Sequence, residues 1–227
     1  MTIHIAVLAS GTGSNLAAII KSIAAGRLEA TVKLVLSNKI DAPVLDIARQ
    51  NGIPVWARDH REYESREAFD EDMLKAIRAG GADTIALAGY MRMLSSMFVK
   101  AYEGRILNIH PAILPSFPGV SGYADAVKYG VRIIGCTAHF VDEQMDHGPV
   151  IIQAAMPFGP NDTAESGMAR IRALEHRIYP QALQWLAGNR LFVEGRRVRL
   201  RAATEVATSQ TGPLGPWIVC PPLEEGF

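Results

Sequence analysis

Two polar side chains that could act on a carbonyl group lie two residues apart, at Asn108 and His110. They close an apolar run that Pro111 stops, so we expect them at the end of a β-strand, where alternate residues point to the same side. An amide and an imidazole placed side by side can donate two hydrogen bonds to one developing oxyanion. The alternative interpretation is a structural histidine beside a turn-forming asparagine.

A carboxylate that could assist this pair stands at Asp146, before His147-Gly148-Pro149. It could orient His110 or relay a proton, although aspartate also favours such turns without any catalytic role. No covalent nucleophile is indicated, because the chain has no GxSxG motif and Cys136 lies inside an apolar run. His110, His139 and His147 do not have the spacing of metal ligands, so we expect no metal. These side chains favour direct attack of a substrate nucleophile on a bound carbonyl.

A glycine-rich segment, Ser10-Gly11-Thr12-Gly13-Ser14-Asn15, follows the first apolar run and precedes an amphipathic stretch. Glycines let the backbone approach a ligand, and a new helix offers unpaired N–H groups, so the segment suits a phosphate. It lacks the third glycine of GxGxxG and the Lys-Ser/Thr pair of a P-loop, which favours a mononucleotide or sugar phosphate over NAD or ATP. Arg66 could reach the same sheet edge. The alternative is a tight turn with Ser14 or Asn15 as a helix cap and a solvated Arg66.

The elements that must position these residues alternate along the first half of the chain. Short, nearly continuous apolar runs predict strands at 3–9, 31–36, 54–57, 83–88 and 105–109. Amphipathic spacing predicts helices at 15–25, 43–50 and 65–78. Repeated βα units of this kind indicate an α/β fold, a Rossmann-like, mostly parallel twisted sheet with helices on both faces.

The second half follows a different pattern. Prolines and glycines crowd residues 111–122, which predicts an irregular loop. Longer strands are expected at 131–141 and 149–156, a long helix at 163–187, and a hairpin at 190–193 and 197–200. We therefore expect one domain at 1–200, with a phosphate-binding N-terminal part, and a C-terminal extension at 201–227. The segment Trp217-Ile218-Val219 could dock on the body.

Composition limits the possible partners. The 227 residues carry 23 basic and 23 acidic side chains, so the formal net charge is zero and a broad nucleic-acid surface is not expected. Only two cysteines are present, which indicates reduced thiols in the cytoplasm rather than a disulfide framework. No apolar run reaches membrane-spanning length. We expect a cytoplasmic protein that binds small molecules, as a monomer or homodimer.

Together these motifs resemble the phosphoribosylglycinamide formyltransferase family over about residues 3–200. The segments that carry the resemblance occur in family order and are Ser10-Gly11-Thr12-Gly13-Ser14-Asn15-Leu16, Ser65-Arg66-Glu67, Leu87-Ala88-Gly89-Tyr90-Met91-Arg92-Met93-Leu94, Leu107-Asn108-Ile109-His110-Pro111, Leu114-Pro115, Phe117-Pro118-Gly119, His139-Phe140-Val141-Asp142, Met145-Asp146-His147-Gly148-Pro149 and Glu175-His176-Arg177-Ile178-Tyr179-Pro180.

The resemblance implies formyl transfer from 10-formyltetrahydrofolate to the amine of glycinamide ribonucleotide in purine (IMP) biosynthesis. It implies that Asn108, His110 and Asp146 are catalytic. The residues it implies for substrate binding are Gly13, Ser14, Asn15, Arg66 and Glu175. Those it implies for the folate pocket are Met91, Arg92, Met93, Leu94, Val141, Asp142, Glu143 and Asp146, with Arg92 near the glutamate tail.

Two departures from the family pattern stand out. After Pro118-Gly119 many relatives carry a histidine-containing stretch, whereas this chain reads Val120-Ser121-Gly122-Tyr123, so a loop contact is missing or replaced by Tyr123. Residues beyond about 200 have no family counterpart.

Several rival functions are expected to fit this chain less well. Methionyl-tRNA formyltransferase normally adds a C-terminal barrel and a basic surface, for which the arginines at 190–201 are the only hint. Formyltetrahydrofolate hydrolase normally carries a regulatory domain ahead of the glycine loop. Outside the family, a non-catalytic phosphate-binding module would use the glycine loop alone. An NAD oxidoreductase is disfavoured by the missing third glycine.

Overall fold

The computed structural model describes residues 2–201, 208–212 and 215–227, and the first half follows the expected βα order. Its elements are β1 (Ile3–Leu8), α1 (Ser14–Ala24), β2 (Ala30–Ser37), α2 (Val44–Gln50), β3 (Val55–Ala57), a short 3-10 helix (His60–Glu62), α3 (Arg66–Ala79), β4 (Thr84–Leu87), α4 (Ser96–Ala101) and β5 (Ile106–His110). Every strand and helix predicted in this half is confirmed within two residues.

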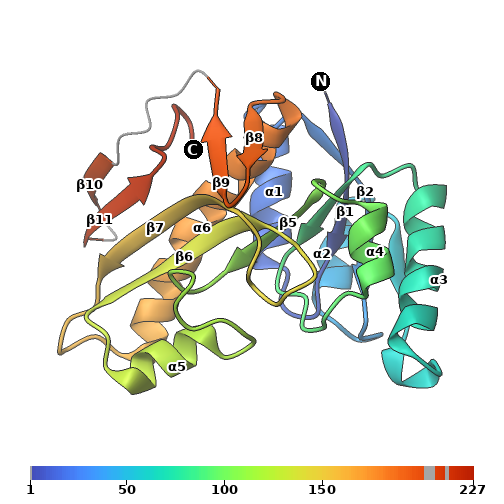
Figure 1. Ribbon diagram of the computed structural model, residues 1–227, viewed down its shortest axis with the longest axis horizontal. Helices are drawn as coiled ribbons and strands as arrows, with labels where there is room; N and C mark the ends of the chain where they lie inside the picture. The colour runs from blue at the N-terminus through green and yellow to red at the C-terminus, as the bar shows by residue number, and fades with distance from the viewer. Residues whose placement is uncertain (1, 202–207, 213–214) are drawn as a thin grey trace.

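The second half contains α5 (Gly122–Tyr129), β6 (Ile133–Phe140), β7 (Val150–Pro157), α6 (Ala164–Ala187), β8 (Leu191–Glu194), β9 (Arg197–Leu200), β10 (Thr208–Gly212) and β11 (Gly215–Cys220). Figure 1 shows them as the green-to-red part of the ribbon. The long helix and the β8–β9 hairpin are confirmed. Two short helices, α4 and α5, were not predicted from the sequence.

One sheet joins the two halves, in the order β10-β11-β7-β6-β5-β4-β1-β2-β3. The strands from β3 to β5 are parallel, as the βα repeats predict, whereas β6, β7, β11 and β10 continue the sheet in antiparallel fashion. Strand β1 pairs with β2 on one side and β4 on the other, so the strand order reverses beside it. In such sheets, ligands bind at the carboxyl ends of the strands that flank this reversal.

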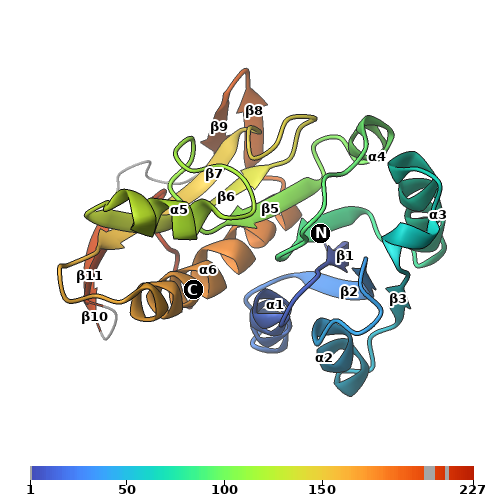
Figure 2. The ribbon, with the colours of Figure 1, turned by 90° about the horizontal axis from the view of Figure 1, so that it is seen from below.

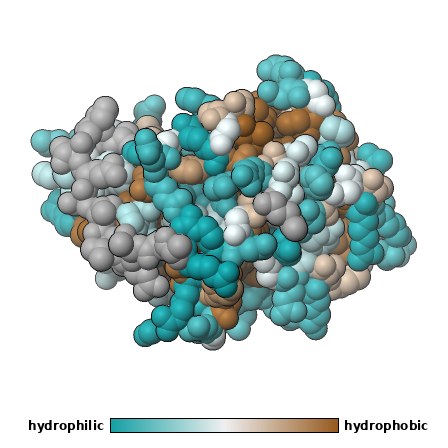
Figure 3. Space-filling model, turned by 90° about the horizontal axis from the view of Figure 1, so that it is seen from above, coloured by the Kyte–Doolittle hydropathy of each residue, from teal (hydrophilic) through white to brown (hydrophobic). Residues whose placement is uncertain are grey.

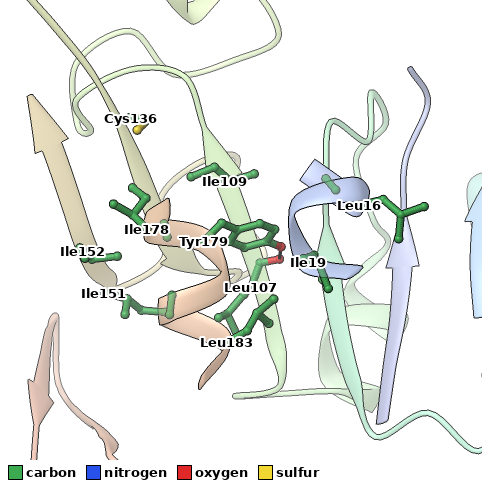
Figure 4. Close-up of a cluster of buried hydrophobic side chains, with 14 of the residues drawn as sticks. Leu16, Ile19, Leu107, Ile109, Cys136, Ile151, Ile152, Ile178, Tyr179 and Leu183 are labelled. Carbon is green, nitrogen blue, oxygen red and sulfur yellow. Dashed lines mark hydrogen bonds between the residues drawn. The ribbon is translucent and has the colours of Figure 1, made fainter. Parts of the chain in front are cut away.

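Helices cover both faces of the sheet, which confirms the α/β prediction. Figure 2 shows α1, α2 and α6 on one side, and α3 and α4 on the other. The two faces bury separate clusters: Leu16 and Ile19 of α1 pack with β5 and α6, whereas Phe69 of α3 and Phe98 of α4 pack on Leu8 and Leu36. In Figure 4, Ile178, Tyr179 and Leu183 of α6 meet side chains of α1, β5 and β7. This packing fixes α1, β5 and α6 relative to one another.

The surface is mixed in character. On the face drawn in Figure 3, hydrophilic residues cover most of the area and hydrophobic ones gather in smaller areas between them. Within the described part of the chain, the helices are too short or too polar to cross a bilayer.

Strand β11 extends the sheet at the edge of β7, where Ile218, Val219 and Cys220 pair with β7 residues 153–155. Trp217 is buried, and the Arg177 guanidinium lies 4.9 Å from its ring centre. The expectation that residues 217–219 could dock on the body is thereby confirmed. Residues 202–207 and 213–214 of the predicted extension lie outside the described residues, and its status as a separate unit stays a prediction.

Replacing Trp217 with alanine is expected to lower the free energy of unfolding by about 3 kcal/mol, because a large buried aromatic side chain is lost. Urea denaturation monitored by circular dichroism measures the change. The matched control is Ile218→Ala on the same strand, since Ile218 is 46% exposed and should cost far less. Equal losses for the two variants would show that β11 does not pack on the body in this way.

Candidate active site

A cavity of about 560 Å³ lies at the carboxyl ends of β1, β4 and β5, where the strand order reverses. Its wall combines the glycine loop, the segment after β4, the end of β5, the loop between β6 and β7, and one face of α6. Among the lining residues are Gly13, Ser14, Asn15, Asn108, His110, Asp146 and Glu175. The structure thus brings together most of the side chains singled out from the sequence.

The glycine loop ends in Gly13, which begins α1 with a left-handed φ of 80° and no side-chain cap. A Cβ at this position would lie 2.8 Å from Val44 Cγ2, so only glycine allows the close approach of α2. The alternative in which Ser14 or Asn15 caps the helix is wrong. The first N–H groups of a helix have no partner within it, and those of α1 face the cavity end lined by Ser14 and Asn15. This geometry suits an anionic group.

Beside this loop, Asn15 Nδ2 donates a hydrogen bond to Glu175 Oε2 at 3.0 Å. Asn15 Oδ1 is buried and has no protein partner. Burial of Glu175 raises the pKa of its carboxyl group to about 7, although the Asn15 hydrogen bond and the charge of Arg172 oppose the shift. Near neutral pH the carboxyl group can therefore both donate and accept a hydrogen bond at the phosphate end of the cavity.

The pKa of Glu175 predicts a pH-dependent difference between wild type and Glu175→Gln. The folded-state pKa lies above the unfolded value of 4.5, so the stabilising contribution is complete below pH 4.5 and is lost as pH rises through about 7. The variant lacks this group, so wild type should lose about 3 kcal/mol relative to it between pH 4.5 and 8. Urea denaturation of both proteins at several pH values measures the difference. A constant difference would mean that Glu175 titrates normally.

Asn108 and His110 lie in the last three residues of β5, and both face Asp146, as period-two geometry predicts. Asn108 Nδ2 donates to Asp146 Oδ1 at 3.3 Å, and His110 Nδ1 lies 3.4 Å from Asp146 Oδ2. His110 Nε2 is 2.9 Å from the carbonyl oxygen of Phe117. Because a carbonyl can only accept, Nε2 carries a proton, and Nδ1 is the nitrogen directed at the carboxylate.

Asp146 reaches this position in an unusual backbone conformation. Its φ of 50° is left-handed, a region that aspartate and asparagine tolerate better than most residues. Its Oδ2 accepts a hydrogen bond from the N–H of Gly119 at 2.7 Å. The carboxylate therefore joins the proline- and glycine-rich loop to β5 and to the β6–β7 loop.

His139 also belongs to the cluster of Asn108, His110 and Asp146, a membership that the sequence analysis did not predict. It pairs with Asn108 across β5 and β6, and its Nε2 lies 3.2 Å from Asn108 Nδ2. Its Nδ1 donates to the carbonyl oxygen of Phe140 at 2.7 Å, which leaves Nε2 of the neutral ring to accept from Asn108. Burial lowers the pKa of His139, mainly by desolvation, which favours this neutral form. His139 thus fixes the orientation of the Asn108 amide.

The opposite wall of the cavity is largely apolar. It contains Met91, Arg92, Met93 and Leu94 after β4, facing Val141, Asp142 and Met145 after β6. Flexible thioether side chains at such a wall suit a flat aromatic ring. The N–H of Met91 donates to Ser10 Oγ at 2.9 Å, so the glycine loop and this wall are joined. The Arg92 guanidinium lies 4.5 Å from the Phe69 ring centre.

Comparisons with known proteins agree on one family. The family model described as formyl transferase matches residues 3–183. Phosphoribosylglycinamide formyltransferase of Escherichia coli K12 is 43% identical over 83% of this chain and 89% of the relative. The crystal structure of glycinamide ribonucleotide transformylase 1 from Symbiobacterium toebii has a TM-score of 0.85 at 45% identity, covering 88% of this chain and 94% of that chain.

The chain belongs to the formyl transferase family. It is also 44% identical over 82% of its length to a trifunctional purine biosynthetic protein of Gallus gallus, of which it spans 18%. The fold prediction is confirmed by these relatives, because solved formyl transferases share the sheet and its helices.

Two residues that the family resemblance implied, Arg66 and Glu143, lie elsewhere. Arg66 is exposed at the start of α3, and neither Arg66 nor Glu143 lines the cavity. Glu143 instead lies near Ser96 and Lys100 of α4. Tyr123 donates to the carbonyl oxygen of Ala164, away from the cavity, and Val120 lines the cavity in its loop. Tyr123 therefore does not stand in for the histidine of other formyl transferases.

Gly122 explains how the segment at 120–123, which departs from the family pattern, fits beside His110. A Cβ at Gly122 would lie 2.4 Å from the Phe117 carbonyl oxygen and 2.6 Å from His110 Nε2. Both atoms belong to the hydrogen bond that orients His110. Helix α5 can begin against this pair because its first residue is glycine. Within the described residues, the acidic, histidine and cysteine side chains form no cluster of three suited to a metal ion.

Proposed function

We propose that this protein transfers the formyl group of 10-formyltetrahydrofolate to the amine of glycinamide ribonucleotide. The single observation that carries the proposal is that Asn108, His110 and Asp146 meet in one cavity that the glycine loop and an apolar wall also line. The glycine loop suits a phosphate, and the apolar wall suits a flat ring. The names of the relatives add the substrate class. A cytoplasmic location belongs to the same proposal, and the low cysteine content, two in 227 residues, supports it.

The phosphate of the ribonucleotide is bound by the N–H groups at the start of α1. Gly13 lets the backbone approach, and Asn15 and Glu175 lie next along the wall, where the ribose or the glycinamide part would be held. The unpartnered Asn15 Oδ1 and the neutral form of Glu175 provide an acceptor and a donor for hydroxyl groups. The pteridine ring of the donor occupies the wall formed by Met91–Leu94 and Val141–Asp142.

In the reaction, the neutral amine attacks the formyl carbon and the carbonyl oxygen becomes an oxyanion. The N–H of His110 Nε2, which bonds to the Phe117 carbonyl oxygen in this structure, turns to the oxyanion when substrate is bound, while Nδ1 faces Asp146. Asn108 Nδ2 makes two long hydrogen bonds, at 3.2 and 3.3 Å, and one of its N–H groups turns to the same oxygen.

Asp146 carries a proton from the attacking amine to the leaving nitrogen. The amine gives up one proton as the new amide forms, and the departing nitrogen of tetrahydrofolate takes one up when its bond to the formyl carbon breaks. Asp146 accepts the first proton through water and returns it to the leaving nitrogen. The chain forms no covalent intermediate, and much of the rate comes from holding amine and formyl group together.

The decisive test is an assay of tetrahydrofolate release from 10-formyltetrahydrofolate, with and without glycinamide ribonucleotide. Release that requires the ribonucleotide is expected. Release at the same rate without it would indicate hydrolysis and would contradict the proposal. No release from folded protein under either condition would favour a phosphate-binding module, and other amino-sugar phosphates would then be tested as acceptors.

A further inference from the structure

The β8–β9 hairpin contacts the loop that carries Asp146. Its turn residue Arg196 donates from Nη2 to the carbonyl oxygen of His147 at 2.6 Å. Nη1 of the same guanidinium lies 3.0 Å from His147 Nε2. Figure 1 shows the hairpin beside β7, with which β9 pairs at Val150. A basic hairpin that the sequence suggested to be a solvated edge therefore holds a backbone carbonyl next to a candidate catalytic residue.

The contact continues from His147 into the cavity wall. His147 Nδ1 lies 2.7 Å from Asp142 Oδ2, so this nitrogen donates to the carboxylate. In the neutral ring Nε2 is then left to accept from Arg196. Asp142 lines the cavity, and its Oδ1 accepts from the N–H of Gln144 at 2.9 Å. Arg196, His147 and Asp142 thus form a chain of hydrogen bonds around the loop at 142–148.

The loop needs such support because of the conformation of Asp146. A left-handed φ at a residue with a side chain is disfavoured and persists where the surroundings hold it. The side chain of Asp146 is held by Gly119 on one side of the loop. Arg196 holds the backbone immediately after Asp146 on the other side.

We propose that Arg196 is a positioning residue, which holds the loop at 142–148 so that Asp146 faces Asn108 and His110. The catalytic consequence rests on the proposed function, whereas the effect on the loop does not. Arg196 itself is exposed and touches none of the reacting groups. It acts through the carbonyl and the ring of His147.

The rest of the hairpin is held without Arg196. Strands β8 and β9 pair along residues 191–194 and 197–200, and the Arg201 guanidinium lies 4.4 Å from the Phe192 ring centre. Leu200, the last residue of β9, is buried. Removing Arg196 should therefore leave the strands in place and release only the loop, which separates positioning from folding.

The experiment compares Arg196→Ala with Arg199→Ala, a matched loss of one exposed hairpin arginine. For Arg196→Ala we expect kcat to fall about tenfold, since small displacements of catalytic groups reduce rates strongly. The KM of the ribonucleotide and the thermal midpoint should stay close to wild type, whereas the KM of the folate donor should rise, because Asp142 lines its part of the cavity. Arg199→Ala should keep its kcat. Arg196→Lys should recover part of the rate, because an ammonium can still donate to the His147 carbonyl.

Amide hydrogen exchange followed by mass spectrometry gives a readout that does not depend on activity. Peptides covering residues 142–148 should exchange faster in Arg196→Ala than in wild type. In Arg199→Ala their exchange rate should equal that of wild type. Equal kcat and equal exchange in the two alanine variants would overturn the inference. If wild type shows no ribonucleotide-dependent release, the proposed function fails, and the exchange comparison still decides whether Arg196 holds the loop.

Discussion

Replacing Asn108 with alanine is expected to lower kcat by about 10²–10³-fold, because one hydrogen-bond donor to the oxyanion is lost. The amide lies on β5 between His139 and Asp146, and it bonds to both. Steady-state kinetics of the ribonucleotide-dependent reaction measures the loss. The KM values should change little, since the oxyanion exists only in the transition state.

The control for this variant is Asn51→Ala. Asn51 is an exposed asparagine directly after α2, and its Nδ2 donates to the carbonyl oxygen of Ile47 at 2.8 Å. Its loss should leave kcat unchanged. Near-wild-type turnover in Asn108→Ala would contradict the role given to the amide, and thermal melting of both variants would separate a catalytic loss from a folding defect.

Replacing Asp146 with asparagine is expected to lower kcat by about 10³-fold, within the range for loss of general acid–base assistance. Asparagine tolerates the left-handed φ of 50°, and its amide oxygen can still accept the N–H of Gly119. The backbone should therefore survive, while the charge that faces His110 and the site that accepts a proton are both lost.

Asp162→Asn is a closely matched control. Asp162 also accepts the N–H of a loop glycine at 2.7 Å, from Gly159, and it pairs with Arg170 outside the cavity. If Asp146 served only its turn, the two variants would behave alike, and both would fold with nearly full activity. A large loss of kcat confined to Asp146→Asn is the expected result.

The strands of the first half and the placement of Asn108 and His110 could be predicted from the sequence, because both depend on local patterns. Asn108 and His110 were placed correctly on one side of a strand end by period two and by Pro111 alone. The glycine loop was correctly placed at the first βα turn. The short helices α4 and α5 were missed because six and eight residues give too little periodicity to detect.

The rest of the candidate site depends on contacts between distant segments. His139 joins the cluster only because β6 pairs antiparallel with β5 in a register that sets it opposite Asn108. The raised pKa of Glu175 follows from burial against α1, and the role of Arg196 follows from a hairpin that lies beside β7. Neither spacing nor residue type indicates such pairings before the sheet order is known.

The phenol of Tyr179 links the helix α6 to two strands at once. Its oxygen lies 2.9 Å from the carbonyl oxygen of Leu87 in β4 and 3.0 Å from that of Leu107 in β5. Tyr179 stands one helical turn after Glu175, while Leu107 directly precedes Asn108. Two substrates that bind against these elements therefore meet at a spacing set by the protein. The two substrates lose their translational and rotational entropy relative to each other when they bind. The chemical step therefore does not have to include this entropy loss in its barrier.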